Sequence, residues 1–325
     1  MRVLITGASG FIGTNLLEYF IAHQHQVCNF DIAPPRNIVH QQHWCKGDLL
    51  NVHDLRATVM GFSPDVIFHL AARTDLDGGS INDYLANTNG VQNLINAARD
   101  TPSLKRILFA SSRLVCKIGY TPHNEYDYCP TTAYGQSKVI GEQIIRDGMS
   151  SVACSYLIVR PTSIWGPWFG APYKNFFLSI AGGSYIHPST ASIHKSFGFV
   201  GNTIYELIAL MAASNKVIHG KTFYLADYTP IDVLNFANSI QDTLGVRPIK
   251  KVSIVFLRAI AWAGTFLQLL GWRHPPLTIF RLNNLITPMV YDLRSLEEIV
   301  GPLPYSTKDG IQITTVWLKA QGDIT

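Results

Sequence analysis

A serine, a tyrosine and a lysine are spaced so that they could move a proton at a carbinol carbon. Ser111 and Ser112 end the apolar run RILFASS, and Tyr134 and Lys138 stand four residues apart in YGQSK. On a helix this spacing puts both side chains on one face. A tyrosine with a pKa of about 10 is a poor base at neutral pH, but a nearby ammonium favours the phenolate. The phenolate could take a proton from a substrate hydroxyl while the serine steadies the substrate oxygen.

A glycine-rich turn near the start of the chain is suited to bind the phosphates of a dinucleotide. The run RVLIT leads into TGASGFIG, which contains Gly7, Gly10 and Gly13. Glycine permits a tight turn and a close approach of backbone to a pyrophosphate, and the next helix would direct free N–H groups at it. A glycine pattern alone is a weak signal, but this one follows a strand and opens a helix.

Two carboxylates follow later strand patterns. Asp31 ends QVCNFD, where it could accept both hydroxyls of the adenosine ribose and repel a 2′-phosphate, which favours NAD over NADP. Arg36 lies a few residues further on and could soften this preference. Asp48, in GDLL, is well placed to meet the adenine ring, with a plain helix N-cap as the alternative.

The elements that must position these residues alternate between strands and helices. Strand patterns cover 2–6, 26–30, 65–72, 106–112 and 154–160, and helix patterns cover 11–22, 81–99 and 134–148. Such alternation predicts an α/β fold with a Rossmann-type doubly wound parallel sheet, whose ligand site lies at the carboxyl ends of the strands. We assign residues 1–166 to this NAD-binding domain, which includes the Ser-Tyr-Lys set.

Residues 167–325 are expected to form a smaller, mostly helical substrate-binding subdomain, with some segments returning to the sheet. Aromatic residues, Pro and Gly crowd 165–177, which indicates a loop that shapes a pocket. A helix is expected over 203–213 and a strand over 222–225. The apolar run 254–272 is at the short end for a membrane span of about 20 residues. It predicts a buried or half-buried helix, with a helix lying on a membrane surface as the alternative.

Composition narrows the classes of partner. Charged residues make up 15% of the chain, against roughly 25% in a typical soluble protein, which favours an oligomer interface, an apolar pocket or membrane contact. The net charge of +4 and the lack of a Lys/Arg cluster argue against nucleic acid. The five cysteines are odd in number and have no CxxC spacing, so we expect reduced thiols, no metal site and a cytoplasmic protein. An apolar strand at the N-terminus argues against a signal peptide.

These motifs together resemble the extended short-chain dehydrogenase/reductase superfamily, in its NAD-dependent epimerase/dehydratase branch. The matching segments are TGASGFIG, HLAA (69–72), NTNG (87–90), FASSRLV, YGQSK and RPTSIWGP. The resemblance implies that Ser112, Tyr134 and Lys138 are catalytic. It implies cofactor contacts at Gly7, Ser9, Gly10, Phe11, Ile12, Gly13, Asp31, Asp48, Leu49, Leu70, Ala71, Ala72, Asn87, Tyr134, Lys138 and Pro161. It also implies a nucleotide-diphosphate sugar as substrate, a place in polysaccharide biosynthesis, and a homodimer formed through the NTNG and YGQSK helices.

The sequence departs from the branch at substrate-facing positions. Dehydratases of this branch carry two acids directly after the catalytic hydroxyl residue, where this chain has Arg113 and Leu114, so 4,6-dehydration is not expected. Asn202 stands where an aspartate is frequent, and Lys195 replaces an arginine that commonly contacts phosphate.

Three functions are therefore weighed. The leading one is an NAD-dependent nucleotide-sugar epimerase or 4-keto reductase. The alternative is a hydroxysteroid-dehydrogenase-like oxidoreductase acting on a lipid alcohol, which the apolar run 254–272 and its potential peripheral membrane contact support. A non-catalytic dinucleotide-binding protein is the third, and the presence of both Tyr134 and Lys138 argues against it.

Overall fold

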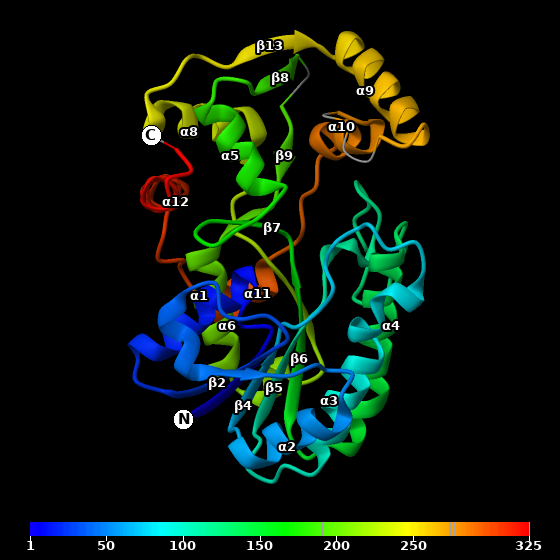
Figure 1. Ribbon diagram of the computed structural model, residues 1–325, viewed down its shortest axis with the longest axis vertical. Coiled ribbons are helices and arrows are strands. Elements are labelled where there is room, and N and C mark those ends of the chain that lie inside the picture. The colour runs from blue at the N-terminus through cyan, green and yellow to red at the C-terminus, as the bar shows by residue number, and fades with distance from the viewer. Residues whose placement is uncertain (190–191, 273–274, 276, 325) are drawn as a thin grey trace.

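A seven-stranded parallel sheet forms the lower part of the molecule in the computed structural model, which describes residues 1–189, 192–272, 275 and 277–324 (Figure 1). All neighbouring strands in it run parallel. The strand order is β11 (Thr222–Leu225), β6 (Ser155–Pro161), β5 (Arg106–Ala110), β4 (Val66–His69), β1 (Arg2–Thr6), β2 (Gln26–Asp31) and β3 (Trp44–Lys46).

Helices cover both faces of this sheet, each over its own apolar core. One face packs against α1 (Phe11–Ala22), α6 (Val200–Ala212) and α11 (Arg294–Val300). The other packs against α2 (Val52–Phe62), α3 (Asn89–Arg99) and α4 (Ala133–Gly148). This arrangement confirms the predicted doubly wound Rossmann-type fold. The buried central strands are Val-, Ile- and Leu-rich, as two covered faces require.

Most predicted elements lie within a few residues of their expected bounds, but the helix expected over 81–99 is broken in two. A 3-10 helix, η2 (Ile81–Asn87), precedes α3, and Thr88 between them has non-helical angles of φ −122° and ψ −76°. The Asn87 side chain accounts for the break. Its amide holds both the N–H and the C=O of Arg73, and a hydrogen bond to Ser137 attaches it to α4.

The chain after residue 166 contributes to both parts of the molecule. The sheet receives β11, and α6 covers one of its faces. Short strand pairs form part of the upper portion of the molecule. The pairs are β7 (Ser163–Trp165) with β10 (Phe197–Phe199), β9 (His194–Lys195) with β12 (Ile231–Asp232), and β8 (Ile186–Ser189) with β13 (Lys250–Ser253). The other helices from this half are α5 (Tyr173–Ala181), α7 (Asn215–Ile218), α8 (Val233–Leu244), α9 (Ile254–Leu269), α10 (Ile279–Ile286) and α12 (Thr307–Ala320). Three short 3-10 helices, η1 (Ile38–His43), η3 (Arg113–Val115) and η4 (Met149–Ser151), lie in connections.

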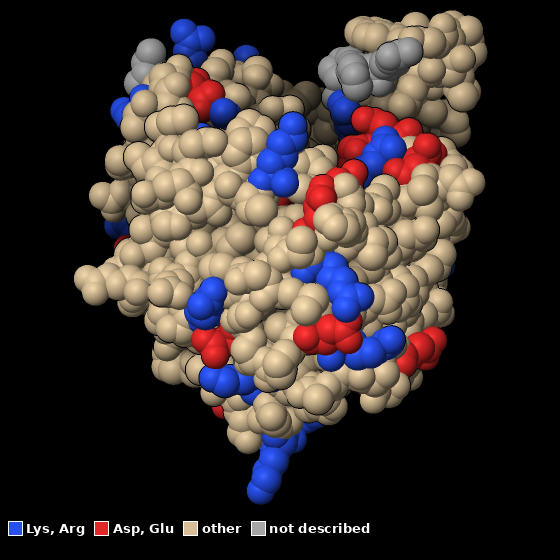
Figure 2. Space-filling model, turned by 60° about the horizontal axis from the view of Figure 1, so that its bottom comes forward, with Lys and Arg blue, Asp and Glu red and all other residues tan. Residues whose placement is uncertain are grey.

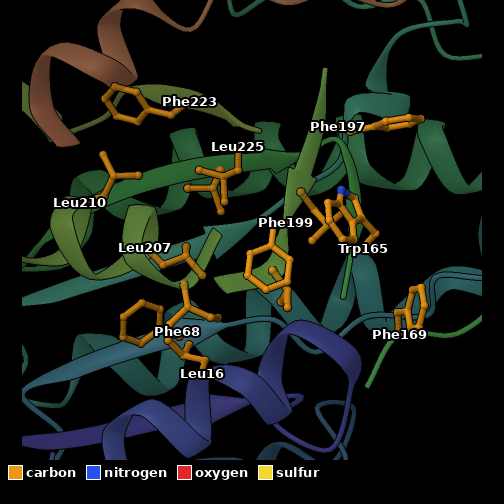
Figure 3. Close-up of a cluster of buried hydrophobic side chains, with 14 of the residues drawn as sticks. Leu16, Phe68, Trp165, Phe169, Phe197, Phe199, Leu207, Leu210, Phe223 and Leu225 are labelled. Atoms are coloured by element: carbon orange, nitrogen blue, oxygen red, sulfur yellow. The ribbon is translucent and has the colours of Figure 1, made fainter. Parts of the chain in front are cut away.

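The aromatic stretch 165–177 differs from the predicted pocket-shaping loop. Trp165, Phe169 and Phe177 are buried, and Figure 3 shows the first two. The Phe177 ring packs against both of the others, and Phe236 of α8 packs against Trp165 and Phe177. These large apolar side chains join the two parts of the molecule, because burying them removes more apolar surface from water than lining a wet pocket would.

The apolar run 254–272 forms a helix, as predicted, but its burial was overestimated. Only Leu257, Ala261 and Gly264 of α9 are buried, in a narrow stripe against α10. A small residue at 264 permits this close contact, since a Cβ there would lie 1.9 Å from the Leu277 carbonyl oxygen. The rest of the helix faces outward at the edge of the molecule (Figure 1). Within the described residues, every helix is too short or too polar to cross a membrane.

Candidate active site

The glycine turn brings the backbone closer to β4 than any side chain would allow. Gly7 has a φ of +78°, and a Cβ on it would lie 2.5 Å from the Ala71 backbone nitrogen. A Cβ on Gly13 would lie 2.3 Å from the Gly7 carbonyl oxygen, so this glycine lets α1 pack against the turn. Gly10 is the N-cap of α1 and supplies no side-chain acceptor to the first helical N–H groups. These groups suit the pyrophosphate of a dinucleotide.

Asp31 lies at the carboxyl end of β2, directly beside this turn. One of its oxygens accepts a hydrogen bond from Ser9 N at 3.0 Å, and the other accepts one from Ala33 N at 3.0 Å. Each carboxylate oxygen retains a free lone pair for a hydroxyl donor. The Arg36 guanidinium is held by the carbonyl oxygens of Ser9 and Trp168, so it is anchored beside the turn.

The other expected cofactor positions lie around the same sheet edge, in differing environments. Asp48 is not the helix N-cap, which is Asn51; its carboxylate accepts from Leu50 N in the turn before α2. The loop 70–72 follows β4, and its first two N–H groups are bound by Thr6. Pro161 ends β6. The side-chain amide of Asn87 is already hydrogen-bonded to the backbone of Arg73 and to Ser137. Asn87 therefore affects the cofactor site by fixing the loop that contains Arg73.

Ser112 and Tyr134 meet at the carboxyl end of β5. Ser112 caps η3, its hydroxyl accepting from Leu114 N at 3.1 Å, and it lies in hydrogen-bonding contact with the Tyr134 phenol. Thr132 caps α4 through Gly135 N, which starts the helix one residue before Tyr134. Two N-caps therefore place the hydroxyl and the phenol together.

Lys138 follows one turn later on α4, and its ammonium points to the strand. Its Nζ donates a hydrogen bond to the Ala110 carbonyl oxygen at 2.9 Å, and burial lowers its pKa to about 8. Burial raises the pKa of Tyr134, while the hydrogen bond with Ser112 and the positive charge of Arg113 oppose the rise. The sequence predicts that Lys138 supplies this charge, but in the structure Arg113 supplies it.

Arg113, which stands where dehydratases of this family carry an acid, is a site residue that the sequence motifs did not predict. It is buried, directly follows Ser112, and its guanidinium lies against Met289, far along the chain. A basic residue immediately after a strand-end hydroxyl was the one sequence signal for it. Asn202, another departure from the family pattern, is structural: its amide joins Asp227 to the backbone of Tyr305.

Both the sequence and the fold of this chain are similar to those of known proteins. The profile of the NAD dependent epimerase/dehydratase family matches residues 3–181. A 3 beta-hydroxysteroid dehydrogenase/Delta 5-->4-isomerase of Mycobacterium tuberculosis is 29% identical over 297 residues, covering 84% of this chain and 76% of that protein. The N-acetyl-alpha-D-glucosaminyl-diphospho-ditrans,octacis-undecaprenol 4-epimerase of Escherichia coli O157:H7 is 30% identical over 212 residues, 62% of this chain and 61% of that one. The structure of a Thermotoga maritima UDP-glucose 4-epimerase with UDP-glucose superposes with a TM-score of 0.77 at 15% identity, covering 99% of each chain.

The family match spans more than half of the chain, and it includes the glycine turn, Asp31 and the Ser-Tyr-Lys set. The close backbone approaches at Gly7 and Gly13 and the carboxylate at the end of β2 fit a dinucleotide, so NAD is the cofactor. The chain belongs to the NAD dependent epimerase/dehydratase family, within the extended short-chain dehydrogenase/reductases.

Proposed function

We propose that this enzyme is a nucleotide-sugar epimerase or 4-keto reductase that transfers hydride at a sugar carbinol carbon. The observation that carries the proposal is the buried group formed by Ser112, Tyr134 and Lys138, at the same sheet edge as the glycine turn. NAD, when bound, supplies the hydride chemistry. Solved relatives of the same fold include complexes with UDP-sugars and NAD, which supports this substrate class.

The residues divide the proton chemistry among them. Tyr134 exchanges a proton with the substrate oxygen, and Ser112 donates a hydrogen bond that steadies this oxygen. Arg113 supplies positive charge beside the phenol. Lys138 holds the nicotinamide ribose, and Asp31 holds the adenosine ribose. With Arg113 and Leu114 in place of acids, no carboxylate follows Ser112 to drive elimination of water, so the reaction stops short of dehydration.

Tyr134→Phe tests the proposal. The variant keeps the ring and its packing against Tyr84 but loses the proton-transfer group, so turnover of a UDP-sugar panel should fall by about 10²–10⁴-fold. NAD binding, followed by quenching of protein fluorescence, should stay unchanged. Thr132→Ser, which keeps the cap of α4, serves as the matched control. Full activity in Tyr134→Phe would reject the assigned role.

A lipid alcohol is the second candidate substrate, because one face of the molecule carries an unusual apolar surface. Trp262 and Phe266 of α9 are 66% and 62% exposed, and Leu269 is 81% exposed. On the face shown in Figure 2, few charged side chains are visible on the upper right lobe, where α9 lies. The mycobacterial relative is named for a steroid substrate and the E. coli relative for an undecaprenol-linked one. Steroid alcohols therefore belong in the same turnover panel as the UDP-sugars.

The surface of α9 fits the face of an anionic membrane. Between residues 243 and 291 the sequence contains no Asp or Glu. Arg258 of α9 is exposed, and so are three basic residues in the segment that leads into this helix, Arg247, Lys250 and Lys251. Aromatic and aliphatic side chains would enter the headgroup region, and the basic residues would contact anionic lipids. We propose that the enzyme is a homodimer in the cytoplasm and that it associates peripherally with the membrane. All five of its cysteines are free, as a reducing compartment requires.

Vesicle sedimentation tests the membrane contact. The protein should sediment with phosphatidylglycerol-containing vesicles, less with phosphatidylcholine alone, and less in high salt. Changing Trp262 and Phe266 together to serine should abolish sedimentation. Val316→Ser on α12 removes an apolar side chain that is equally exposed, and it should have no effect. Protein that stays in the supernatant with anionic vesicles would contradict the proposal.

A further inference from the structure

Two buried cations lie against the same methionine near the catalytic hydroxyl. Arg113 is 7% exposed and Lys195 is 4% exposed. The Arg113 Nη1 lies 3.0 Å from the Met289 sulfur, and Lys195 is paired with Met289 across an isolated β-bridge. Lys195 and Met289 thus place the upper part of the molecule against Arg113.

Neither cation has a counter-ion in the part of the chain that the structure describes. Arg113 and Lys195 take part in none of its salt bridges. The guanidinium contacts a thioether, which is a weak acceptor, and the Tyr291 phenol, while the Lys195 ammonium donates to the Asn284 carbonyl oxygen. Burial and the charge of Arg113 lower the pKa of Lys195 to about 7. Buried charges without partners are costly, so this pair favours a bound anion.

The position of the pair limits where that anion can lie. Arg113 directly follows Ser112, and its charge acts on the Tyr134 phenol. An anion held by Arg113 would therefore lie on the same side of the site as the hydroxyls of Ser112 and Tyr134. The planar guanidinium forms paired hydrogen bonds with a carboxylate or a phosphate, which a sterol alcohol lacks.

Position 195 is where the family commonly has a phosphate-contacting arginine, so an anion contact at Lys195 is expected from the family. We propose that Arg113 adds a second cation to that contact in this chain, and that it selects substrates carrying a phosphate or carboxylate group close to the reacting carbinol. This inference rests on the proposed function, because it takes Ser112 and Tyr134 as the reacting centre. It favours an acidic or phosphorylated sugar over a neutral lipid alcohol. It gives Arg113 a substrate-binding role at the position where dehydratases carry an acid.

Binding measurements test the subsite independently of turnover. Tyr134→Phe protein loaded with NAD is titrated calorimetrically with UDP-glucuronate, UDP-glucose and inorganic pyrophosphate. Adding Arg113→Gln should weaken the binding of at least one probe by tenfold or more, because hydrogen bonds to a charged group are lost. Arg113→Lys should restore part of the affinity, and Lys251→Gln, an exposed basic residue on β13, should leave it unchanged.

The pattern among the probes identifies the source of the charge. Weakening of all three assigns the subsite to phosphate, and weakening of UDP-glucuronate alone assigns it to a sugar carboxylate. If the three probes fail to bind, or bind Arg113→Gln as they bind the parent, the subsite is rejected. Lys195→Gln provides the same comparison should Arg113→Gln fail to fold. Turnover that survives Tyr134→Phe would reject the proposed function instead and leave these binding results to be judged separately.

Discussion

Asp31 illustrates how a single carboxylate can set cofactor preference. Both of its oxygens are already oriented by backbone N–H groups, from Ser9 and Ala33, so the side chain is fixed before any ribose arrives. Fixing the acceptor in advance reduces the ordering cost of binding. The carboxylate also repels a 2′-phosphate.

We expect Asp31→Ala to weaken NAD binding and to narrow the gap between NAD and NADP. Loss of charge-assisted hydrogen bonds should raise the dissociation constant for NAD by about tenfold or more. Fluorescence titration with both dinucleotides measures the change, and Asp77→Ala, an exposed acid elsewhere, is the control. An unchanged preference would mean that Asp31 does not contact the ribose.

Glu206 is a residue whose burial stabilises its neutral form. The side chain is fully buried on α6, has no side-chain hydrogen-bond partner among the described residues, and lies near Asp227. Burial and the Asp227 charge raise its pKa well above the ordinary value, and burial raises the pKa of Asp227 to about 6. A raised folded-state pKa means that stability is full below the unfolded-state pKa of about 4.5 and falls as pH rises toward the folded-state value.

Glu206→Gln should therefore stabilise the protein at pH 8 by about 1 kcal/mol or more, and the gain should shrink toward pH 5. Thermal melting followed by circular dichroism across this range gives the comparison. Glu298→Gln, an exposed glutamate on α11, should be neutral throughout. A Glu206→Gln protein that is less stable at pH 8 would show that the carboxylate is ionised and held by a favourable contact.

At the scale of elements, the strands and the catalytic helix were predictable, and the contacts between distant segments were not. Strand 222–225 and helix 11–22 match their predicted bounds, because apolar periodicity and caps act locally. The contact between Arg113 and Met289 depends on the backbone pairing of Met289 with residues 194–196, and no local sequence pattern encodes this long-range pairing. The break at Thr88 depends on a side-chain clamp to α4, so periodicity alone indicated one long helix.

The exposure of α9 also could not be predicted from the sequence, because it depends on which distant segment the helix contacts. Its composition predicts burial, but only the stripe around Gly264 finds a partner, in α10, and this stripe forms a small core of its own. That core is separate from the two that cover the sheet. The α9–α10 pair should therefore respond to mutation without disturbing the sheet.

Gly264→Leu should separate α9 from α10, because even a Cβ at this position meets the Leu277 carbonyl oxygen. We expect limited proteolysis within 254–290 to become several-fold faster, while the main thermal transition stays in place. Ala263→Leu adds the same side chain on the exposed face and should leave the cleavage rate unchanged. Equal resistance of both variants would show that the helix pair can repack around the new side chain.

At the scale of the whole molecule, the predicted homodimer would bury the outer surface of α3 and α4. Val139 and Ile140 of α4 are only half-buried and belong to none of the described apolar clusters. They directly follow Lys138 on the helix that carries Tyr134. Packing this helix against its copy would fix the catalytic helix in place and would explain why an apolar surface persists there.

We expect light scattering to give twice the chain mass of 36.1 kDa for the wild-type protein. Ile140→Arg places two like charges at the centre of the interface and should convert the dimer to monomers, since buried unpaired charges are strongly unfavourable. Ile313→Arg on α12, which is 38% exposed, adds the same charge on another face and should stay dimeric. Because α4 holds the phenol, monomeric Ile140→Arg should also lose activity at dilution. A wild-type monomer at micromolar concentration, or a dimer that tolerates Ile140→Arg, would place the interface elsewhere or remove it.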